Sequence, residues 1–289
     1  MKVDVKRFGA QPLRDVQAGN RAWWTAQTMS YDWKDKVPLE KFSPAWFDEI
    51  DRRFLLGARL VTRDANPFAS LMNLGALAGK RVLEIGCGMG LHAQMLAQAG
   101  ASLTTIDISD TSVEATRKRF ALKQLAGEIL QMDAEQLAFA DNSFDLVWSW
   151  GVIHTSSRTG RIVKEIARVL KPGGSGKVMV YNLAGTSAYL TMMLHYSWAF
   201  WRGKPSVDEI LWRSSDGFSA RFYTIDLLTD LFATFFDEIE VQTFGQEADA
   251  VPLPRMLRRV ACRFVSDSTQ RRLACQRGSF LYATVRKPS

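Results

Sequence analysis

The sequence predicts an α/β fold in which a doubly wound, mostly parallel sheet is covered by helices on both faces. Two observations carry this prediction. Residues 80–183 alternate short apolar runs with helical patterns, which is typical of a parallel sheet. A glycine-rich turn, Gly86-Cys87-Gly88-Met89-Gly90, directly follows the first apolar run at 82–85. Because ligands of such sheets bind beyond the carboxyl ends of the strands, we expect a binding site at that edge.

The later strands of this core end at residues suited to binding. After the first run, strands are expected at 103–107, 129–134, 144–150 and 177–181. Asp107 ends the second strand, and Asp133 with Ala134 ends the third. Trp150 ends the fourth strand, and His154 follows it. These side chains should therefore converge with the glycine turn on one edge of the sheet.

These segments, in this order, resemble the class I S-adenosylmethionine-dependent methyltransferases. The likeness is to the branch that includes ubiquinone- and menaquinone-biosynthesis and natural-product methyltransferases, and it covers residues 80–183. It implies a Rossmann-like, seven-stranded sheet that binds S-adenosylmethionine (SAM). The glycines are spaced G-x-G-x-G, whereas dinucleotide folds use G-x-G-x-x-G. The resemblance is specific for cofactor and fold, and it leaves the methyl acceptor open.

The resemblance implies roles at the cofactor. Glycines let the ligand lie against backbone, and Asp107 would accept hydrogen bonds from two ribose hydroxyls. Asp133 would accept from the adenine amino group, with a helix N-cap as its alternative role. Glu84 would orient the glycine turn or the methionine amine, and Tyr31 would cover the cofactor. The residues expected to contact the cofactor are Tyr31, Glu84, Gly86, Cys87, Gly88, Gly90, Asp107, Ile108, Asp133, Ala134 and Trp150.

His154 is the candidate catalytic base. Histidine titrates near neutrality and can take a proton from a carbon acid or a hydroxyl. The alternative is that His154 only shapes the pocket; His195 is a second candidate, and His92 is expected to be structural. Methyl transfer from a sulfonium needs alignment and exclusion of water, so we expect no metal site.

The chain divides into four parts around the core. Residues 1–79 are expected to form a helical leader or lid, and 80–183 the SAM-binding core. Residues 184–223 should be a helical cap over the substrate pocket. Residues 224–289 should complete the sheet with an antiparallel pair, separated by a basic helical insertion at about 246–278.

The net charge of +7 is concentrated at the end of the chain. From Val251 onward there are nine Lys and Arg against one acid, which could face an anionic substrate, a membrane or nucleic acid. We favour a solvated basic face on a helix at 256–264, with an apolar stripe beside the arginines. Residues 183–201 contain no Asp, Glu, Lys or Arg, but their polar side chains disfavour a membrane span. Peripheral membrane contact through 183–201 or 255–277 stays open, as does the oligomeric state.

The sequence thus predicts SAM-dependent methyl transfer to a small, largely apolar metabolite, at carbon or oxygen, with a prenyl- or quinone-like acceptor as one candidate. A nicotinamide-dependent oxidoreductase and a catalytically silent SAM-binding scaffold are the alternatives. No nucleic-acid partner is expected, because the segment after the fourth strand lacks the Asn/Asp-Pro-Pro-aromatic pattern of base methyltransferases. Three scattered cysteines and no visible signal peptide favour a cytoplasmic location.

Overall fold

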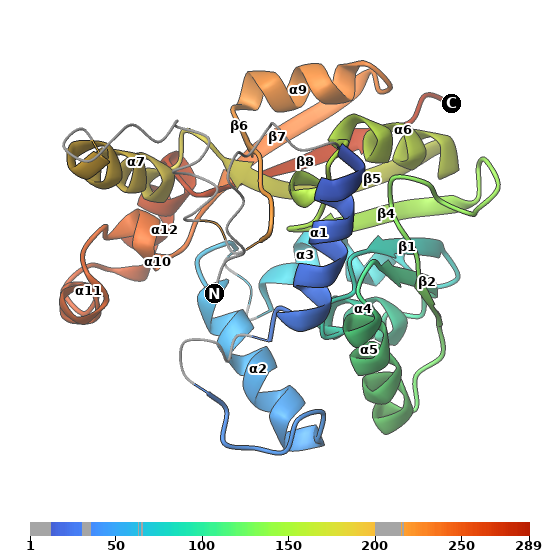
Figure 1. Cartoon of the computed structure of the whole chain (residues 1–289), viewed down its shortest axis with the longest axis horizontal. Coiled ribbons are helices and arrows are strands. Elements are labelled where there is room, and N and C mark those ends of the chain that lie inside the picture. Colours follow the sequence, from blue (N-terminus) through green and yellow to red (C-terminus); the bar gives the residue numbers. More distant parts are fainter. Residues whose placement is uncertain (1–12, 31–35, 63, 65, 200–214, 216) are drawn as a thin grey trace.

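The computed structural model describes residues 13–30, 36–62, 64, 66–199, 215 and 217–289 (Figure 1). Its centre is an eight-stranded sheet. The strands are β1 (Arg81–Ile85), β2 (Ser102–Asp107), β3 (Glu128–Gln131), β4 (Phe144–Trp150), β5 (Leu170–Asn182), β6 (Phe222–Tyr223), β7 (Glu238–Phe244) and β8 (Phe280–Arg286). Their order is β3-β2-β1-β4-β5-β8-β7, and β6 pairs with β5 outside this path.

Helices surround the sheet. They are α1 (Leu13–Ala26), α2 (Pro44–Gly57), α3 (Pro67–Met72), α4 (Leu91–Gln98), α5 (Asp110–Lys123), α6 (Thr159–Val169), α7 (Thr186–Ala199), α9 (Ile225–Ala233), α10 (Glu247–Ala250), α11 (Arg255–Ala261) and α12 (Asp267–Gln276), with 3₁₀ turns η1 (Leu74–Ala76) and η2 (Ile153–Thr155). Local signals set several starts: Ser43 accepts from the N–H of Trp46, and Pro44 occupies the first position of α2.

The pairing directions confirm the predicted doubly wound, mostly parallel sheet. Strands β1 to β5 pair in parallel along the main path, and β8 is antiparallel to both β5 and β7. The strand count differs from the expected seven, because β6 adds two residues in parallel beside Tyr181 and Asn182. Two residues are too few to show alternation in sequence, so this strand fell within the expected cap.

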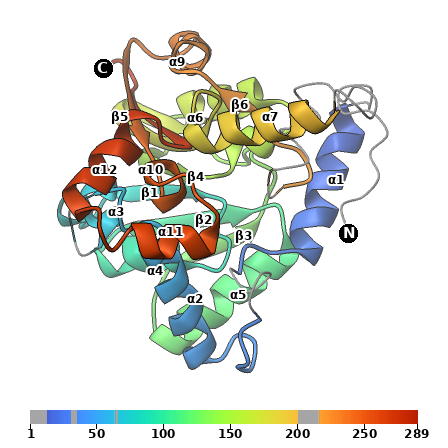
Figure 2. The same cartoon turned by 90° about the vertical axis from the view of Figure 1, so that its left-hand side faces the viewer.

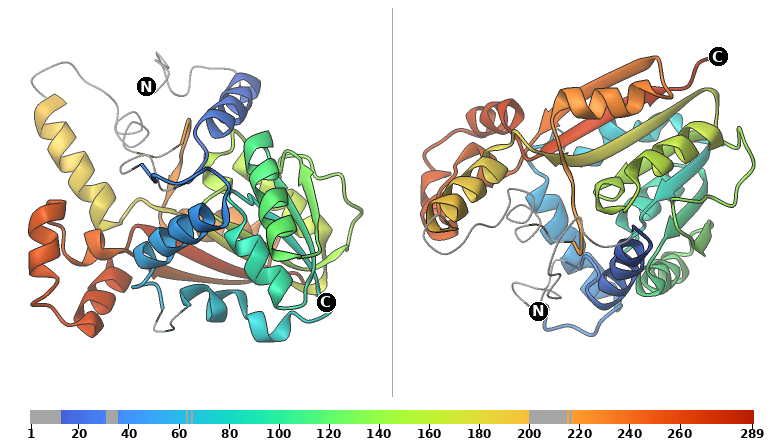
Figure 3. Two further views of the ribbon diagram at one scale, coloured as in Figure 1. Left: turned by 90° about the horizontal axis from the view of Figure 1, so that it is seen from below. Right: turned by 45° about the horizontal axis from the view of Figure 1, so that its top comes forward.

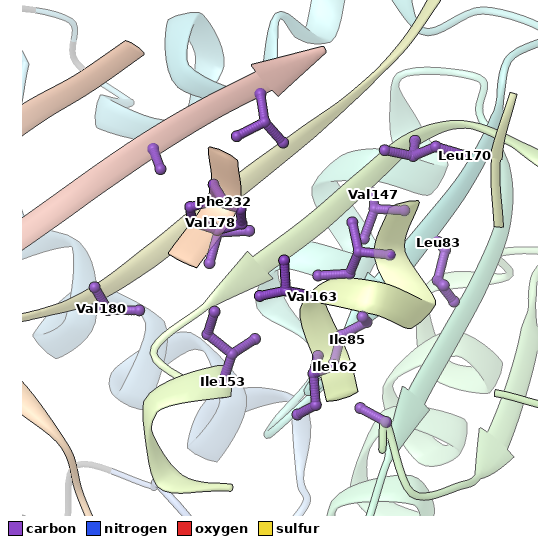
Figure 4. Packing of buried hydrophobic residues seen from close by; sticks show 14 of the residues in the cluster. Leu83, Ile85, Val147, Ile153, Ile162, Val163, Leu170, Val178, Val180 and Phe232 are labelled. Carbon is purple, nitrogen blue, oxygen red and sulfur yellow. The ribbon is translucent and has the colours of Figure 1, made fainter. Parts of the chain in front are cut away.

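The two faces of the sheet carry separate hydrophobic cores. Val147 of β4 and Val178 of β5 pack with α6 and α9 residues such as Ile162 and Phe232, as Figure 4 shows. The neighbouring Trp148 points to the other face, where residues of α3, α4 and α5 pack. This alternation places helices on both faces, and so leaves the ends of the strands as the open edge for a ligand.

Two helical segments leave the sheet at the carboxyl edge. α7 follows the end of β5, and α10 to α12 join the end of β7 to the start of β8. Tyr181 pairs with Phe280, and Phe280 pairs with Phe244, so these strand ends lie side by side. Figure 3 shows α7 and the α10–α12 segment grouped on the same side of the molecule.

The leader is anchored to the core by a buried ion pair. Arg119 of α5 is fully buried and makes two bonds of 2.7 Å to the Asp51 carboxylate of α2. Its Nε donates to the carbonyl of Met89, at the end of the glycine turn, over 2.7 Å. Because a buried charge must be paired, this contact fixes α2 beside the turn.

The apolar stripe of α11 differs from an ordinary packed helix face. Leu257 and Val260 are exposed, and so is Phe264 in the turn that follows. Ala261 alone of the stripe packs against a small cluster with α12. Within the described residues, no helix combines the length and apolar character that crossing a bilayer requires.

Candidate functional site

A cavity of about 1030 Å³ lies at the carboxyl edge of the sheet. One end is formed by the loops after β1, β2 and β3, and the other by α2, α7, α10 and α11. The residues expected at the cofactor that line it are Gly86, Cys87, Gly88, Asp107, Ile108, Asp133, Ala134 and Trp150. The structure therefore brings together residues from four strand ends, in the arrangement that the sequence predicts.

The glycine turn needs glycine for two separate reasons. Gly86, Gly88 and Gly90 have φ of 90°, 51° and 81°, in the left-handed region. A Cβ on Gly86 would lie 2.2 Å from Cγ2 of Val152, so the loop after β4 approaches its backbone directly. Gly88 has open space at this position. Gly90 is the N-cap of α4 and does not line the cavity, so it serves the fold of the turn.

Asp107 is held at the cavity by backbone donors. The N–H of Gly88 donates to its Oδ2 over 3.0 Å, and the N–H of Ser109 donates to its Oδ1 over 2.9 Å. Burial raises the pKa of Asp107 above its ordinary value, and the N–H groups of Ser109 and Gly88 oppose that rise. Each oxygen has further acceptor capacity, so the carboxylate is arranged to receive a pair of hydroxyls.

One carboxylate oxygen of Asp133 caps a local turn, and the other accepts from no donor among the described residues. Its Oδ1 accepts from the N–H of Glu135 over 2.9 Å, which is a local cap, and from Nε2 of Gln17 over 2.9 Å. No bond to its Oδ2 is made by the residues that the structure describes. Gln17 also accepts from the N–H of Ser157 over 3.2 Å, and so ties α1 across this end of the cavity.

Glu84 lies under the glycine turn and outside the cavity lining. It is buried, and the hydroxyl of Thr105 donates to its Oε2 over 2.6 Å. Burial raises the pKa of Glu84 to about 8, and the neighbouring Asp107 adds to the rise. The pKa of the Cys87 thiol is also raised, mainly by burial and secondly by the negative charge of Asp107. At neutral pH the floor of the turn is therefore uncharged at both positions.

His154 is buried in η2, behind the wall of the cavity. Its ring packs against that of Tyr181, with 4.1 Å between centroids, and Tyr181 itself lines the cavity. Burial lowers the pKa of His154 to about 3. Its Nδ1 has no partner among the described residues. His154 is therefore a neutral imidazole one ring away from the cavity.

The remaining candidates fall in different places. His92 lines the cavity, and its Nδ1 accepts from the indole N–H of Trp148 over 3.2 Å. Burial lowers the pKa of His92 to about 3. Tyr31 lies outside the described residues, and the same holds for the side chain of His195. Among the described residues, no group of three or more His, Cys, Asp or Glu side chains could hold a metal ion.

Several lining residues could not be expected from sequence patterns. They come from α1, α2 and β5, and they are Gln17, Asn20, Phe54, Tyr181 and Asn182. Asn20 donates to the carbonyl of Thr155 over 2.6 Å and accepts from the hydroxyl of Ser219 over 3.1 Å. None belongs to a motif, and their partners are distant in the chain, so sequence offers no local signal for them.

The geometry agrees with comparisons to known proteins. Residues 83–176 match the family model described as "Methyltransferase domain". This segment is therefore similar to a methyltransferase domain. This confirms the resemblance drawn from the glycine turn and the strand-end carboxylates. The domain covers the cofactor end of the cavity, from β1 to the middle of β5.

Two relatives and one solved structure illustrate the breadth of this likeness. A ubiquinone biosynthesis O-methyltransferase from Parvibaculum lavamentivorans is 30% identical over 55% of this chain and 60% of its own length. A fatty-acid O-methyltransferase from Mycolicibacterium smegmatis is 40% identical over 33% of this chain and 35% of its own. A [4+2]-cyclase, SpnF, has a TM-score of 0.53 at 20% identity, over 77% of this chain and 81% of its own.

The likeness to these two relatives covers 55% and 33% of this chain. The chain spans about three fifths of the first relative and about a third of the second. A structural neighbour that is a cyclase shows that the fold by itself leaves the reaction open. Assignment of an activity therefore rests on the site.

Proposed function

We propose that this chain transfers a methyl group from SAM to a small, largely apolar acceptor, at carbon or oxygen. The observation that carries the proposal is the convergence of the glycine turn, Asp107 and Asp133 on one cavity that continues to a helix-lined end, where aromatic rings and arginines share the lining. The first end suits a nucleoside with a charged amino-acid tail, and the second suits the acceptor.

The cofactor end supports SAM through its spacing and its acceptors. Asp107 would take the ribose hydroxyls, in bonds strengthened by its charge, and Oδ2 of Asp133 would take the adenine amino group. The N–H groups of the turn would meet the methionine end. When bound, SAM supplies the electrophilic methyl group, while the chain orients the acceptor and excludes water.

The acceptor end supports an apolar substrate. Trp150 lines the cavity and stacks against Trp148, with 5.7 Å between centroids and 11° between planes. Phe54 and Phe280 add further rings to the lining. The names of the two relatives, a ubiquinone biosynthesis O-methyltransferase and a fatty-acid O-methyltransferase, also refer to largely apolar compounds. A prenyl- or quinone-like acceptor, one candidate from the sequence, is compatible with this lining.

We propose His154 as the base, although the ring of Tyr181 lies between it and the cavity. An acceptor that displaces or shifts the Tyr181 ring would bring its proton within reach of a neutral imidazole. A silent SAM-binding scaffold is the second candidate, because His154 lies behind the cavity wall in the structure and the cyclase shares the fold.

Incubation with methyl-labelled SAM tests the proposal. The protein is mixed with solvent-extracted lipids and quinones, and label in the organic phase is measured. We expect transfer by the wild type and at least tenfold less by Asp107→Ala at limiting SAM. Binding of S-adenosylhomocysteine (SAH) with no transfer to any apolar extract would support the scaffold instead.

A further inference from the structure

The outer face of α11 exposes an apolar patch. Met256, Leu257, Val260 and Phe264 are 83%, 60%, 54% and 85% exposed. Single exposed apolar residues are ordinary on protein surfaces. Four large ones within nine positions of the chain form a contiguous patch, which marks a surface that contacts something less polar than water.

Arginines are interleaved with this patch. Arg258, Arg259 and Arg263 lie on or directly after α11, and no acid occurs between residues 251 and 266. The nearest acids along the chain, Glu247 and Asp267, pair with Arg59 at 2.8 and 3.1 Å. Within the described residues these three arginines have no ion-pair partner. The patch is therefore apolar and cationic together.

A second exposed apolar set lies on α7, which also contributes to the lining of the cavity. Tyr189, Met193 and Leu194 are 60%, 51% and 68% exposed. Figure 2 shows α7 and α11 on the face turned to the viewer, with the ends of the strands behind them. Ala188 of α7 and Arg258 of α11 both line the cavity. Both helices that carry an exposed apolar patch therefore border the cavity.

We propose that α7 and α11 seat this protein on an anionic membrane surface, and that the methyl acceptor is a lipid which enters the cavity between them. Apolar side chains would enter the acyl boundary while arginines meet anionic headgroups, the usual arrangement of interfacial helices. Charge complementarity favours a membrane over a neutral apolar partner, since arginines surround the apolar positions. Arg258 and Arg259, at the cavity wall, would draw the headgroup region of the acceptor toward the opening.

The lipid acceptor rests on the proposed methyl transfer, whereas membrane docking does not. Docking is measured by co-sedimentation with vesicles of phosphatidylcholine alone, or of phosphatidylcholine and phosphatidylglycerol in equal parts. SAH binding is measured on the same preparations by calorimetry, so that each part is scored separately. We expect the wild type to bind the anionic vesicles, to bind neutral vesicles at least tenfold more weakly, and to lose affinity as salt rises from about 0.1 to about 0.5 M.

Paired variants locate the contact. Met256→Ser with Phe264→Ser should weaken vesicle binding at least tenfold, and Arg259→Gln with Arg263→Gln should weaken it about tenfold and flatten its salt dependence. The matched controls lie on other helices. Leu122→Ser with Leu227→Ser removes exposed apolar side chains of α5 and α9, and Arg161→Gln with Lys164→Gln removes two charges of α6. All variants should bind SAH as the wild type does.

The outcomes separate the two claims. Absence of anionic-vesicle binding by a wild type that binds SAH overturns docking and leaves methyl transfer standing. If the α11 variants and their controls lose vesicle binding equally, docking at this face is also overturned. If the wild type forms dimers that the Met256→Ser with Phe264→Ser variant abolishes, the patch belongs to a second copy, and the proposal is wrong. If the wild type binds vesicles but not SAH, docking is supported and the proposal of a lipid methyl acceptor is overturned.

Discussion

The two ends of the cavity are built in different ways. At the cofactor end, short loops after β1, β2 and β3 present backbone N–H groups and two carboxylates, each within a few residues of its strand. At the acceptor end, side chains come from α2, α7, α10 and α11, which are far apart in sequence. The first end is set by the core of the sheet, and the second by segments added to its edge.

This difference separates general chemistry from specificity. The parts that would hold SAM depend on strand order and on a left-handed backbone that favours glycine. They can stay the same while the acceptor changes. The parts that would hold the acceptor can vary in length and composition without disturbing the sheet. Variants at the cofactor end should therefore lower cofactor affinity or stability, whereas variants at the acceptor end should lower turnover.

The largest effect is expected at the acceptor end, for His154→Ala. A general base contributes about 10²- to 10⁴-fold in rate, so turnover should fall by that range while SAH affinity stays nearly unchanged. His154→Gln should be equally impaired, because an amide cannot take the proton. Because burial lowers the pKa of His154 to about 3, kcat/KM should show no acid limb from this group between pH 5 and 8. If His154→Gln is nearly as active as the wild type, His154 positions the acceptor and does not take its proton.

The next effect concerns stability at the cofactor end and its dependence on pH. Burial raises the pKa of Glu84 to about 8 from an ordinary value of 4.5. The folded state therefore holds a proton that the unfolded state releases, so this contribution is complete below about pH 4.5 and is lost as pH rises to about 8. The loss amounts to a few kcal/mol, at about 1.4 kcal/mol per pKa unit.

Glu84→Gln removes the titrating group and nearly preserves its shape. Urea unfolding at pH 5, 6.5 and 8 should show a free energy of unfolding that falls with pH in the wild type more than in the variant. The two proteins should differ most at pH 8, where the variant is expected to be the more stable. Parallel pH profiles would mean that Glu84 is ionised in the folded protein.

A smaller effect is expected for Gly86→Ala, also at the cofactor end. The left-handed backbone costs roughly 1–2 kcal/mol with a Cβ, and overlap with Val152 adds about 1 kcal/mol or more. Gly79→Ala is the matched control, since its φ is 72° and its Cβ would meet nothing within 4 Å. Thermal unfolding should show the larger loss for Gly86→Ala; equal losses would place the whole cost in the backbone.

The features that could be predicted from sequence lie mainly at the cofactor end of the cavity. Alternation and glycine spacing gave the sheet, its order of elements and the cavity positions of Asp107 and Asp133, because these signals lie within a few residues of each other. The contact of Gln17 with Asp133 joins residues 116 positions apart, and nothing local marks it. The exposure of Phe264 could not be expected either, because an apolar stripe has the same pattern whether it packs or faces solvent.

The central claim is that the strand-end half of the cavity is a SAM site, and calorimetry with SAH and NAD tests it most directly. The wild type should bind SAH and give no signal with NAD. Asp107→Ala should bind SAH about ten- to a hundredfold more weakly, since a charge-assisted acceptor contributes about 1.5–3 kcal/mol. Tight NAD binding without SAH binding, or an Asp107→Ala variant that binds SAH like the wild type, would contradict the account.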